Sequence, residues 1–365
     1  MIYRIGIENF KSIQKANISL LPINILIGAN GAGKSNFISF FKLLNQIYEQ
    51  NLQTYIAQNG RADNFLYFGR KKSHSLKGLI TFTNNIGNIV NRYGFVLTPN
   101  TENNFFFQLE KKGFNKGNNK NENWHDNDIA TASLESTLKK DKTYISVFVQ
   151  SHLASFRVYH FHDTSASASV KQFSRLNDNE SLRDNGSNLA AFLYRLKEKN
   201  PSSYQLIEAT IKSIAPFFKA FDLTPSRLNE DSIELKWIEE GSDMYLNAHN
   251  LSDGTLRMIC LATLLLQPDL PKTIIIDEPE LGLHPVAINK LAGLLKKAAE
   301  KGSQIIVSTQ SVGLIDNFDP EDIIVTDREN QQSVFKRLST EELKDWLDDY
   351  SLGELWNKNI IGGRP

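Results

Sequence analysis

The sequence predicts an α/β fold built around a phosphate-binding loop, and three observations favour this fold. An apolar run of strand length at residues 23–27 is followed by a glycine-rich stretch at residues 28–36, GANGAGKSN. Apolar residues then recur at helical spacing as far as Leu44. A second apolar strand, at residues 273–276, ends in two acidic residues. A strand, a glycine loop and a helix in this order distinguish a P-loop from an ordinary turn.

The glycine-rich stretch matches the P-loop pattern G-x-x-x-x-G-K-[ST] at Gly28, Gly33, Lys34 and Ser35. Glycine lets backbone N–H groups approach phosphate oxygens, and the start of the following helix adds its positive dipole. In such loops the lysine reaches the β- and γ-phosphates, and the hydroxyl binds Mg²⁺. We therefore expect the chain to bind a nucleoside triphosphate. The predicted nucleotide-binding residues of the loop are Asn30, Gly31, Ala32, Gly33, Lys34, Ser35 and Asn36.

The acidic pair at the end of the second strand is Asp277 and Glu278. In P-loop enzymes an acid at this place binds Mg²⁺, so Asp277 and Ser35 are the predicted metal ligands. Glu278 is placed to orient and deprotonate the attacking water. Acidic residues also end strands in ordinary solvated turns, and the P-loop upstream is what favours catalysis here. Ser35 and Asp277 are 277 − 35 = 242 residues apart, which is too far for a small GTPase or kinase core.

Composition limits the class of protein and its surroundings. The 365 residues carry 41 basic and 41 acidic side chains, so the net charge does not indicate nucleic-acid or membrane binding. A balanced net charge does not exclude a local basic groove. No run of 18 apolar residues exists, and the N-terminus is too polar for a signal peptide. The single cysteine, Cys260, lies in an apolar run and is expected to be a buried small hydrophobe. We expect a cytoplasmic protein without membrane contact.

The remaining elements follow from periodicity and turn residues. Strands are expected at residues 3–10, 16–21, 304–308 and 323–326, an antiparallel meander at 78–110, and helices at 37–48, 187–199, 203–220, 256–266, 285–299 and from 340. The Asn- and Lys-rich stretch at residues 111–128 predicts an exposed, mobile loop.

The two segments with nucleotide-binding motifs are separated by a middle segment with a different sequence pattern. This arrangement predicts a discontinuous ATPase domain. Residues 1–115 are expected to form the N-terminal lobe, with the P-loop and the meander. Residues 116–230 are expected to form an inserted, largely helical arm or lid that includes the mobile loop. Residues 231–365 are expected to form the C-terminal lobe.

A small-residue turn, LSDGTLR at residues 251–257, opens a helix 26 residues before Asp277. The start of that helix can cap phosphate oxygens a second time. Standing alone, the turn would be an ordinary helix cap made by Ser252.

Four stretches in this order resemble the head domains of ABC-type ATPases of the SMC, RecF and overcoming-lysogenisation group: GANGAGKSN, LSDGTLR, IIIDEPELGLHP and VSTQS. The chain is also similar end to end to a family of compact bacterial predicted ATPases, through IENFKSI, YHFHDTS and the closing LGELW and IGGRP. The resemblance implies an ABC/SMC-type head with mixed sheets, working as a head-to-head homodimer that encloses two ATP molecules. Ser252 and Gly254 of one subunit would then face the P-loop and acidic pair of the other.

The same resemblance implies further site residues. Lys11 and Ser12 match a segment that lies near the nucleotide in this group, and residues 280–285 match the loop that couples the two sites. Gln310 stands where many such heads have a switch histidine, and it joins Glu278 and Lys34 as a predicted catalytic residue. Glutamine can donate a hydrogen bond to a phosphate oxygen or water but, unlike histidine, cannot become a cation near neutral pH. The switch role of Gln310 is therefore in doubt, whereas nucleotide binding is not. A Q-loop glutamine is not identified in residues 61–72.

Weaker patterns have a structural and a functional interpretation. His160, His162 and Asp163 share a strand and could bind a metal, but nothing completes a ligand set, so structural roles are favoured. The basic run at residues 70–72 fits a solvated loop better than DNA-backbone contact. The closing IIGGRP suggests docking on a partner, although such an ending is ordinarily a flexible tail. Three tryptophans are expected to pack rather than stack on bases, namely Trp237, Trp346 and Trp356.

The function favoured is an ATP-driven dimeric switch in DNA repair or in defence against foreign DNA, acting with a separately encoded effector such as a nuclease. DNA is a possible ligand. The alternative is the ATPase subunit of a membrane transporter. An SMC-like tether needs long heptad repeats, which residues 120–250 do not sustain. Because only 365 − 311 = 54 residues follow Ser311, we expect any nuclease activity on another chain.

Overall fold

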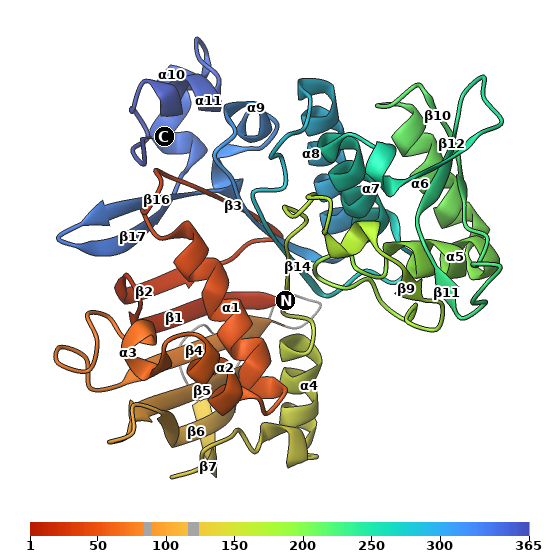
Figure 1. Ribbon diagram of the computed structural model, residues 1–365. Coiled ribbons are helices and arrows are strands. Elements are labelled where there is room, and N and C mark those ends of the chain that lie inside the picture. Colours follow the sequence, from red (N-terminus) through yellow and green to blue (C-terminus); the bar gives the residue numbers. More distant parts are fainter. Residues whose placement is uncertain (84–88, 116–123, 365) are drawn as a thin grey trace.

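The computed structural model describes residues 1–83, 89–115 and 124–364. Within these residues, an antiparallel six-stranded sheet has the order β2-β1-β4-β5-β6-β7. It fills the lower left of Figure 1. Its strands are β1 Ile2–Phe10, β2 Ile13–Ser19, β4 Leu76–Thr83, β5 Ile89–Pro99, β6 Phe105–Asn115 and β7 Trp124–Ala130.

A second six-stranded sheet among the described residues has the order β17-β16-β3-β15-β14-β8. Its strands are β3 Ile23–Ile27, β8 Arg157–Tyr159, β14 Thr273–Asp277, β15 Gln304–Ser308, β16 Ile323–Glu329 and β17 Gln332–Arg337. All neighbouring pairs are parallel except β16 and β17. The carboxyl ends of β3, β14 and β15 therefore meet at one edge, which is where α/β sheets bind ligands.

Helix α1, Lys34–Tyr48, lies between the two sheets and explains how they hold together (Figure 1). Its apolar side chains share one core with residues of the antiparallel sheet and with Ile275 and Ile306 of the second sheet. Phe40 packs on Phe10 of β1, with ring centroids 5.4 Å apart. Burial of such aromatic rings is the main stabilising contribution at this junction.

The other face of the second sheet packs against α7 Asp253–Leu266 and α8 Pro285–Glu300 in a second core. The remaining helices are α2 Leu52–Gln58, α3 Arg61–Phe65, α4 Tyr144–Leu153, α5 Leu189–Lys199, α6 Pro201–Lys212, α9 Val312–Ile315, α10 Thr340–Leu347 and α11 Leu352–Asn357. Two smaller sheets contain β10 Phe218–Asp222, β12 Lys236–Glu239 and β13 Tyr245–Asn247, and β9 Ser174–Arg175 with β11 Ser232–Ile233.

The fold predicted from the sequence, α/β with mixed sheets, is confirmed, and two element predictions are wrong. The helix expected at 203–220 ends at Lys212, and β10 begins at Phe218. Pro216 lies between them, and proline lacks the N–H that a helix needs and disfavours helix at the residue before it. The loop expected at 111–128 is strand at both ends, because β6 continues to Asn115 and β7 begins at Trp124. Its residues 116–123 lie outside the described part of the chain.

The division into three segments stays a prediction. Within the middle segment, β7 pairs with β6 of the antiparallel sheet and β8 pairs with β14 of the second sheet. This range therefore contributes strands to both large sheets in addition to the helices expected there.

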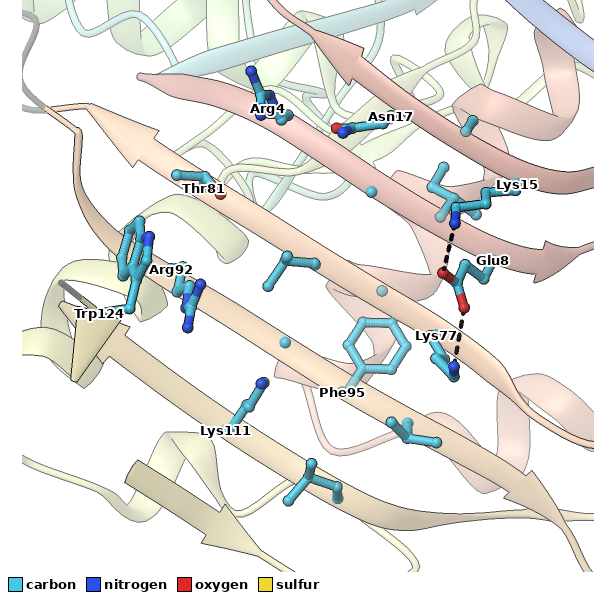
Figure 2. A pocket seen from close by; sticks show the side chains of 18 of the residues that line it. Arg4, Glu8, Lys15, Asn17, Lys77, Thr81, Arg92, Phe95, Lys111 and Trp124 are labelled. Carbon is cyan, nitrogen blue, oxygen red and sulfur yellow. Dashed lines mark ion pairs between the residues drawn. The ribbon is translucent and has the colours of Figure 1, made fainter. Parts of the chain in front are cut away.

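The outer face of the antiparallel sheet forms a shallow groove with mixed charge (Figure 2). Glu8 pairs with Lys15 (3.9 Å) and Lys77 (3.0 Å) from the neighbouring strands. Asp126 likewise pairs with Arg92 (2.6 Å) and Lys111 (3.1 Å). These are cross-strand ion pairs of the kind that stabilise a solvated sheet face.

The C-terminal segment folds back onto the P-loop strand. The ring N–H of Trp356 donates to Gly363 O (2.5 Å), and Gly363 N–H donates to Asp327 Oδ2 (3.2 Å). A Cβ at Gly363 would lie 3.3 Å from the Cα of Gly28. Residues 361–363 thus dock on their own chain, and whether they also dock on a partner stays a prediction.

The packing predicted for the tryptophans is confirmed for Trp237 and Trp356, and for Trp346 it stays a prediction. Trp356 is fully buried and Trp237 is 2% exposed. Trp346 is 44% exposed, because α10 lies on the surface and its ring contacts only Tyr350 among the described aromatic rings (6.1 Å between centroids). Of the described helices, none is long and apolar enough to cross a membrane.

Candidate nucleotide site

The P-loop joins β3 to α1 at the carboxyl edge of the second sheet. Its glycines adopt backbone conformations that other residues rarely reach, with φ of 149° at Gly28, 78° at Gly31 and 121° at Gly33. Packing excludes side chains as well. A Cβ at Gly28 would lie 2.1 Å from Thr326 O, and a Cβ at Gly33 would lie 2.0 Å from Ser333 Oγ. The chain therefore requires glycine at both ends of the motif.

Lys34, the first residue of α1, is buried beneath the loop. Its Nζ donates to Gly28 O (2.5 Å) and to Ala29 O (3.2 Å). Burial lowers the pKa of Lys34, and the nearby carboxylates of Glu278, Asp277 and Glu280 partly offset this effect. The cation of the loop and the acids of the second strand thus lie within reach of one another.

The other predicted loop residues surround this lysine. Asn30, Gly31 and Ser35 are exposed, whereas Ala32 is buried. The Asn36 side chain instead faces the N-terminal hairpin, where its Nδ2 donates to Ser12 Oγ (2.7 Å). The loop offers its backbone and the Ser35 hydroxyl to solvent, as a phosphate site requires.

Ser12 and Lys11 lie beside the loop and its helix. Ser12 shares a hydrogen bond with Ser333 (2.7 Å between Oγ atoms), and Ser333 Oγ donates to Ala32 O (2.6 Å). Lys11 Nζ donates to Ser39 Oγ of α1 (3.0 Å), and burial lowers the pKa of Lys11. The position of both residues next to the P-loop agrees with the expectation, while direct contact with a nucleotide stays a prediction.

Asp277 ends β14, one strand away from β3 in the sheet order β3-β15-β14. Its Oδ1 accepts a hydrogen bond from Ser308 Oγ at the end of the neighbouring strand β15. His162 Nε2–H donates to the main-chain carbonyl of Asp277 (2.7 Å). These contacts hold the strand end in place. The bond from Ser308 reaches only Oδ1 of Asp277 and does not involve Oδ2.

Glu278 follows in a left-handed backbone conformation, with φ of 43°. Such a conformation costs free energy in a residue other than glycine and persists only where neighbouring contacts hold it. Its N–H donates to Ser308 O (2.9 Å), and its Oε1 accepts a hydrogen bond from the side-chain amide of Gln310. The structure therefore brings together the predicted base and the predicted switch residue.

Glu280, two residues further along, is a buried carboxyl beneath the same segment, 9% exposed. Its Oε1 accepts hydrogen bonds from Thr309 Oγ1 (2.5 Å) and from Gln310 N–H (3.1 Å). Burial raises the pKa of Glu280. The sequence placed this residue only in a coupling loop, because motif spacing carries no information on which side chains turn inward.

Ser252 and Gly254 lie at the start of α7, next to the loop that follows the acidic pair. Ser252 is exposed and caps α7 by accepting from Thr255 N–H (3.2 Å). A Cβ at Gly254 would lie 2.4 Å from Gly282 O, so this glycine permits close packing on the loop after Glu278. Among the described residues, no hydrogen bond joins Ser252 to the P-loop.

Arg257 ties this segment to the rest of the site. Its guanidinium donates to Phe161 O (3.1 Å), to His162 O (2.8 Å) and to Leu281 O. One side chain thus joins α7, the segment after β8 at residues 161–162 and the loop after Glu278. Arg257 lies within the LSDGTLR motif, but the sequence predicts no role for it, since an arginine that bonds three backbone carbonyls leaves no signature in motif spacing.

The structural interpretation of the weaker patterns stays a prediction. The strand expected at His160 and His162 is wrong, because β8 ends at Tyr159. His162 donates to the main-chain carbonyl of Asp277, and no group of three or more potential metal ligands occurs among the described residues. Arg70 bonds Asp63 (3.2 Å), consistent with a structured loop. Cys260 is buried, as expected, and burial raises its pKa to about 12.

Comparisons with known proteins agree with this geometry. A family model described as "AAA domain, putative AbiEii toxin, Type IV TA system" matches residues 23–316, which is more than half of the chain. Two solved structures share the fold at 15% identity. The SMC head bound to the C-winged helix domain of ScpA has a TM-score of 0.62 and covers 94% of this chain and 99% of its own. The Smc head domain with an extended coiled coil bound to the C-terminal domain of ScpA, from Pyrococcus furiosus, has a TM-score of 0.58. It covers 95% of this chain and 98% of its own.

Curated relatives match over shorter stretches. UvrABC system protein A of Haemophilus ducreyi is 29% identical over 126 residues, which cover 34% of this chain and 13% of that protein. The energy-coupling factor transporter ATP-binding protein EcfA of Methanocaldococcus jannaschii is 39% identical over 67 residues, 18% of this chain and 23% of that protein. The chain thus spans less than a quarter of the length of these two relatives. The family match, together with the P-loop and the acidic strand end that it contains, places the chain in this AAA-domain family as a P-loop ATPase, with a fold that it shares with SMC heads.

Proposed function

We propose that this ATPase hydrolyses ATP at a site shared by two copies of the chain. The observation that carries the proposal is the position of Ser252, which is exposed and bonded to its own helix start rather than to the P-loop. A helix start with free N–H groups is a site for phosphate oxygens. In a head-to-head dimer, Ser252 and Gly254 would meet the nucleotide held by Lys34 of the other copy.

Each residue of the acidic strand end has a distinct role in this proposal. Ser35 and Asp277 would hold Mg²⁺, and they fit it because an exposed hydroxyl and a carboxylate are the oxygen ligands that it prefers. Mg²⁺ would supply positive charge next to the β- and γ-phosphates. Glu278 would act as general base on the attacking water, with Gln310 holding its carboxylate.

The P-loop side supplies binding. Gly31 is exposed, and no other side chain or backbone atom lies within 4 Å of the place where its Cβ would stand, so phosphate groups could approach the backbone closely there. Lys34 would exchange its bonds to two loop carbonyls for charge-assisted bonds to phosphate oxygens. Lys11 and Ser12 would support the loop from the N-terminal hairpin.

The ATP-driven dimer would act in the cytoplasm in DNA repair or in defence against foreign DNA. It would work with a separately encoded effector such as a nuclease, and DNA is a candidate ligand. The support is the resemblance of the four motifs to SMC- and RecF-like heads and the shared fold with SMC head structures. The alternative, a transporter ATPase subunit, has the partial match to EcfA in its favour. Copurification with a membrane permease would establish that alternative.

The Glu278→Gln variant tests the proposal. It should bind ATP and Mg²⁺ like the wild type but hydrolyse ATP at least about 10²-fold more slowly, the usual scale for losing a general base. Since the nucleotide would then persist, sedimentation velocity should show an ATP-dependent dimer that the wild type forms only transiently. Turnover within a few-fold of wild type would contradict the role of Glu278. A slow but strictly monomeric variant would contradict the shared site.

A further inference from the structure

The buried carboxyl of Glu280 is unusual because it forms no ion pair among the described residues, although Lys34 lies near enough to feel its charge. Its two hydrogen-bond donors, the Thr309 hydroxyl and the Gln310 N–H, both reach Oε1. Oε2 is buried and has no hydrogen-bond partner among the described residues. Burying a carboxyl with half of its acceptor capacity unused costs free energy. A hydrophobic side chain in this position would avoid the cost of the buried carboxyl but would leave the Thr309 hydroxyl and the Gln310 N–H without this acceptor, so the glutamate serves to hold these two donors.

The groups that Glu280 holds lead directly to the candidate base. The main-chain N–H of Gln310 donates to Glu280 Oε1, which holds Gln310 in place. The side-chain amide of Gln310 donates to Glu278 Oε1. Glu278 and Glu280 follow β14, and Thr309 and Gln310 follow β15, its parallel neighbour. The carboxyl of Glu280 therefore links the two strand ends on which the candidate base and its partner stand.

The backbone at this point needs such a link. Glu278 has a left-handed φ of 43°, and its own N–H bonds back to Ser308 O (2.9 Å). A strained residue keeps one orientation only where several contacts determine it. The described connections between the strand ends include the bond between the side chains of Ser308 and Asp277, the main-chain bond from Glu278 to Ser308, and the bonds that Glu280 accepts from the Thr309–Gln310 segment.

We propose that Glu280 is a positioning residue for ATP hydrolysis, because its carboxyl fixes the Thr309–Gln310 segment and so sets the orientation of the Glu278 carboxylate. The inference rests on the proposed function, in which Glu278 is the general base. It predicts an effect on turnover that is much larger than any effect on ATP binding, since the side-chain hydrogen bonds of Glu280 among the described residues go to Thr309 and Gln310 and none goes to the P-loop.

Two substitutions separate positioning from simple packing. Glu280→Gln keeps a carbonyl oxygen that accepts from Thr309 and Gln310, so kcat should stay within about 3-fold of wild type. Glu280→Leu keeps the volume and removes the acceptor, so kcat should fall by roughly 10- to 100-fold, the scale of a misplaced catalytic group. The Kd for ATP should change less than about 3-fold in both, since neither variant alters the P-loop. Glu300→Leu, on the exposed end of α8, is the matched control and should behave as wild type.

Thr309→Val provides a second variant in case Glu280→Leu does not fold. It removes one donor to Oε1 and should lower kcat by roughly 3- to 10-fold with the Kd for ATP unchanged. The inference is overturned if Glu280→Leu and Thr309→Val turn over like the wild type, or if Glu280→Gln is as slow as Glu280→Leu. Measuring Glu278→Gln in parallel distinguishes the two proposals. Activity in Glu278→Gln refutes the proposed function, whereas loss there with normal Glu280→Leu refutes only this inference.

Discussion

Replacing Lys34 with alanine tests the nucleotide site at the residue that carries its positive charge. Lys34 is 5% exposed and donates to Gly28 O and Ala29 O. In the complex these two donors would turn to phosphate oxygens, where a hydrogen bond to a charged group contributes about 1.5–3 kcal/mol. Losing two such bonds predicts a loss of about 3–6 kcal/mol, or roughly 10²- to 10⁴-fold in the Kd for ATP.

The fold should tolerate this change. Burial lowers the pKa of Lys34, so the charged side chain is itself costly in the folded protein, and its removal should leave the melting temperature nearly unchanged. Isothermal titration calorimetry with ATP and Mg²⁺ measures the affinity, and Lys34→Arg serves as a matched variant that retains charge. Because the guanidinium is larger and planar, Lys34→Arg should also bind weakly. Near-normal ATP affinity in folded Lys34→Ala would refute the assignment of the P-loop.

Two further predictions concern stability. Trp356→Ala should lower the free energy of unfolding by about 3–5 kcal/mol, because the ring is fully buried and its N–H donates to Gly363 O. Denaturant unfolding measures this free energy. A loss under about 1 kcal/mol would contradict the docking of the C-terminal segment. Burial lowers the pKa of His152 from 6.5 to about 4, so its contribution to stability is complete above pH 6.5 and is lost as the pH falls toward 4. The loss of folding free energy is at most about 3 kcal/mol. His152→Phe should therefore show a smaller decline of the urea midpoint between about pH 7 and 5 than the wild type. Parallel declines in the two proteins would argue against His152 as the titrating group.

The sequence was sufficient for the parts of the site that are contiguous in the chain. The glycines of the P-loop and the acids after β14 follow apolar strands, so local pattern and motif chemistry agree there. The helix predicted from 203 failed at Pro216, where a helical pattern of apolar residues continued past a residue that cannot extend the helix.

The remaining contacts depend on pairs of residues far apart in the chain. Ser333 fills the space beside Gly33, and Gly363 packs near Gly28, although each pair is separated by hundreds of residues. Arg257 and His162 act through backbone carbonyls, which leave no pattern in side-chain types. Glu280 was visible in the motif, but only the register of β14 against β15 shows that its carboxyl holds Gln310.

The claim that two chains share each ATP site is tested most directly by mixing two inactive variants, Lys34→Ala and Ser252→Arg. Lys34→Ala removes the P-loop cation, and Ser252→Arg places a bulky cation at the exposed start of α7 without touching the P-loop of its own chain. Each variant alone should be inactive, and Ser252→Arg should still bind ATP. In a mixed dimer one composite site carries both lesions and the other carries neither, so ATPase activity should return to part of the wild-type level. No recovery, with mixed dimers demonstrated by differential tags, would contradict the shared site and indicate an ATPase complete within one chain.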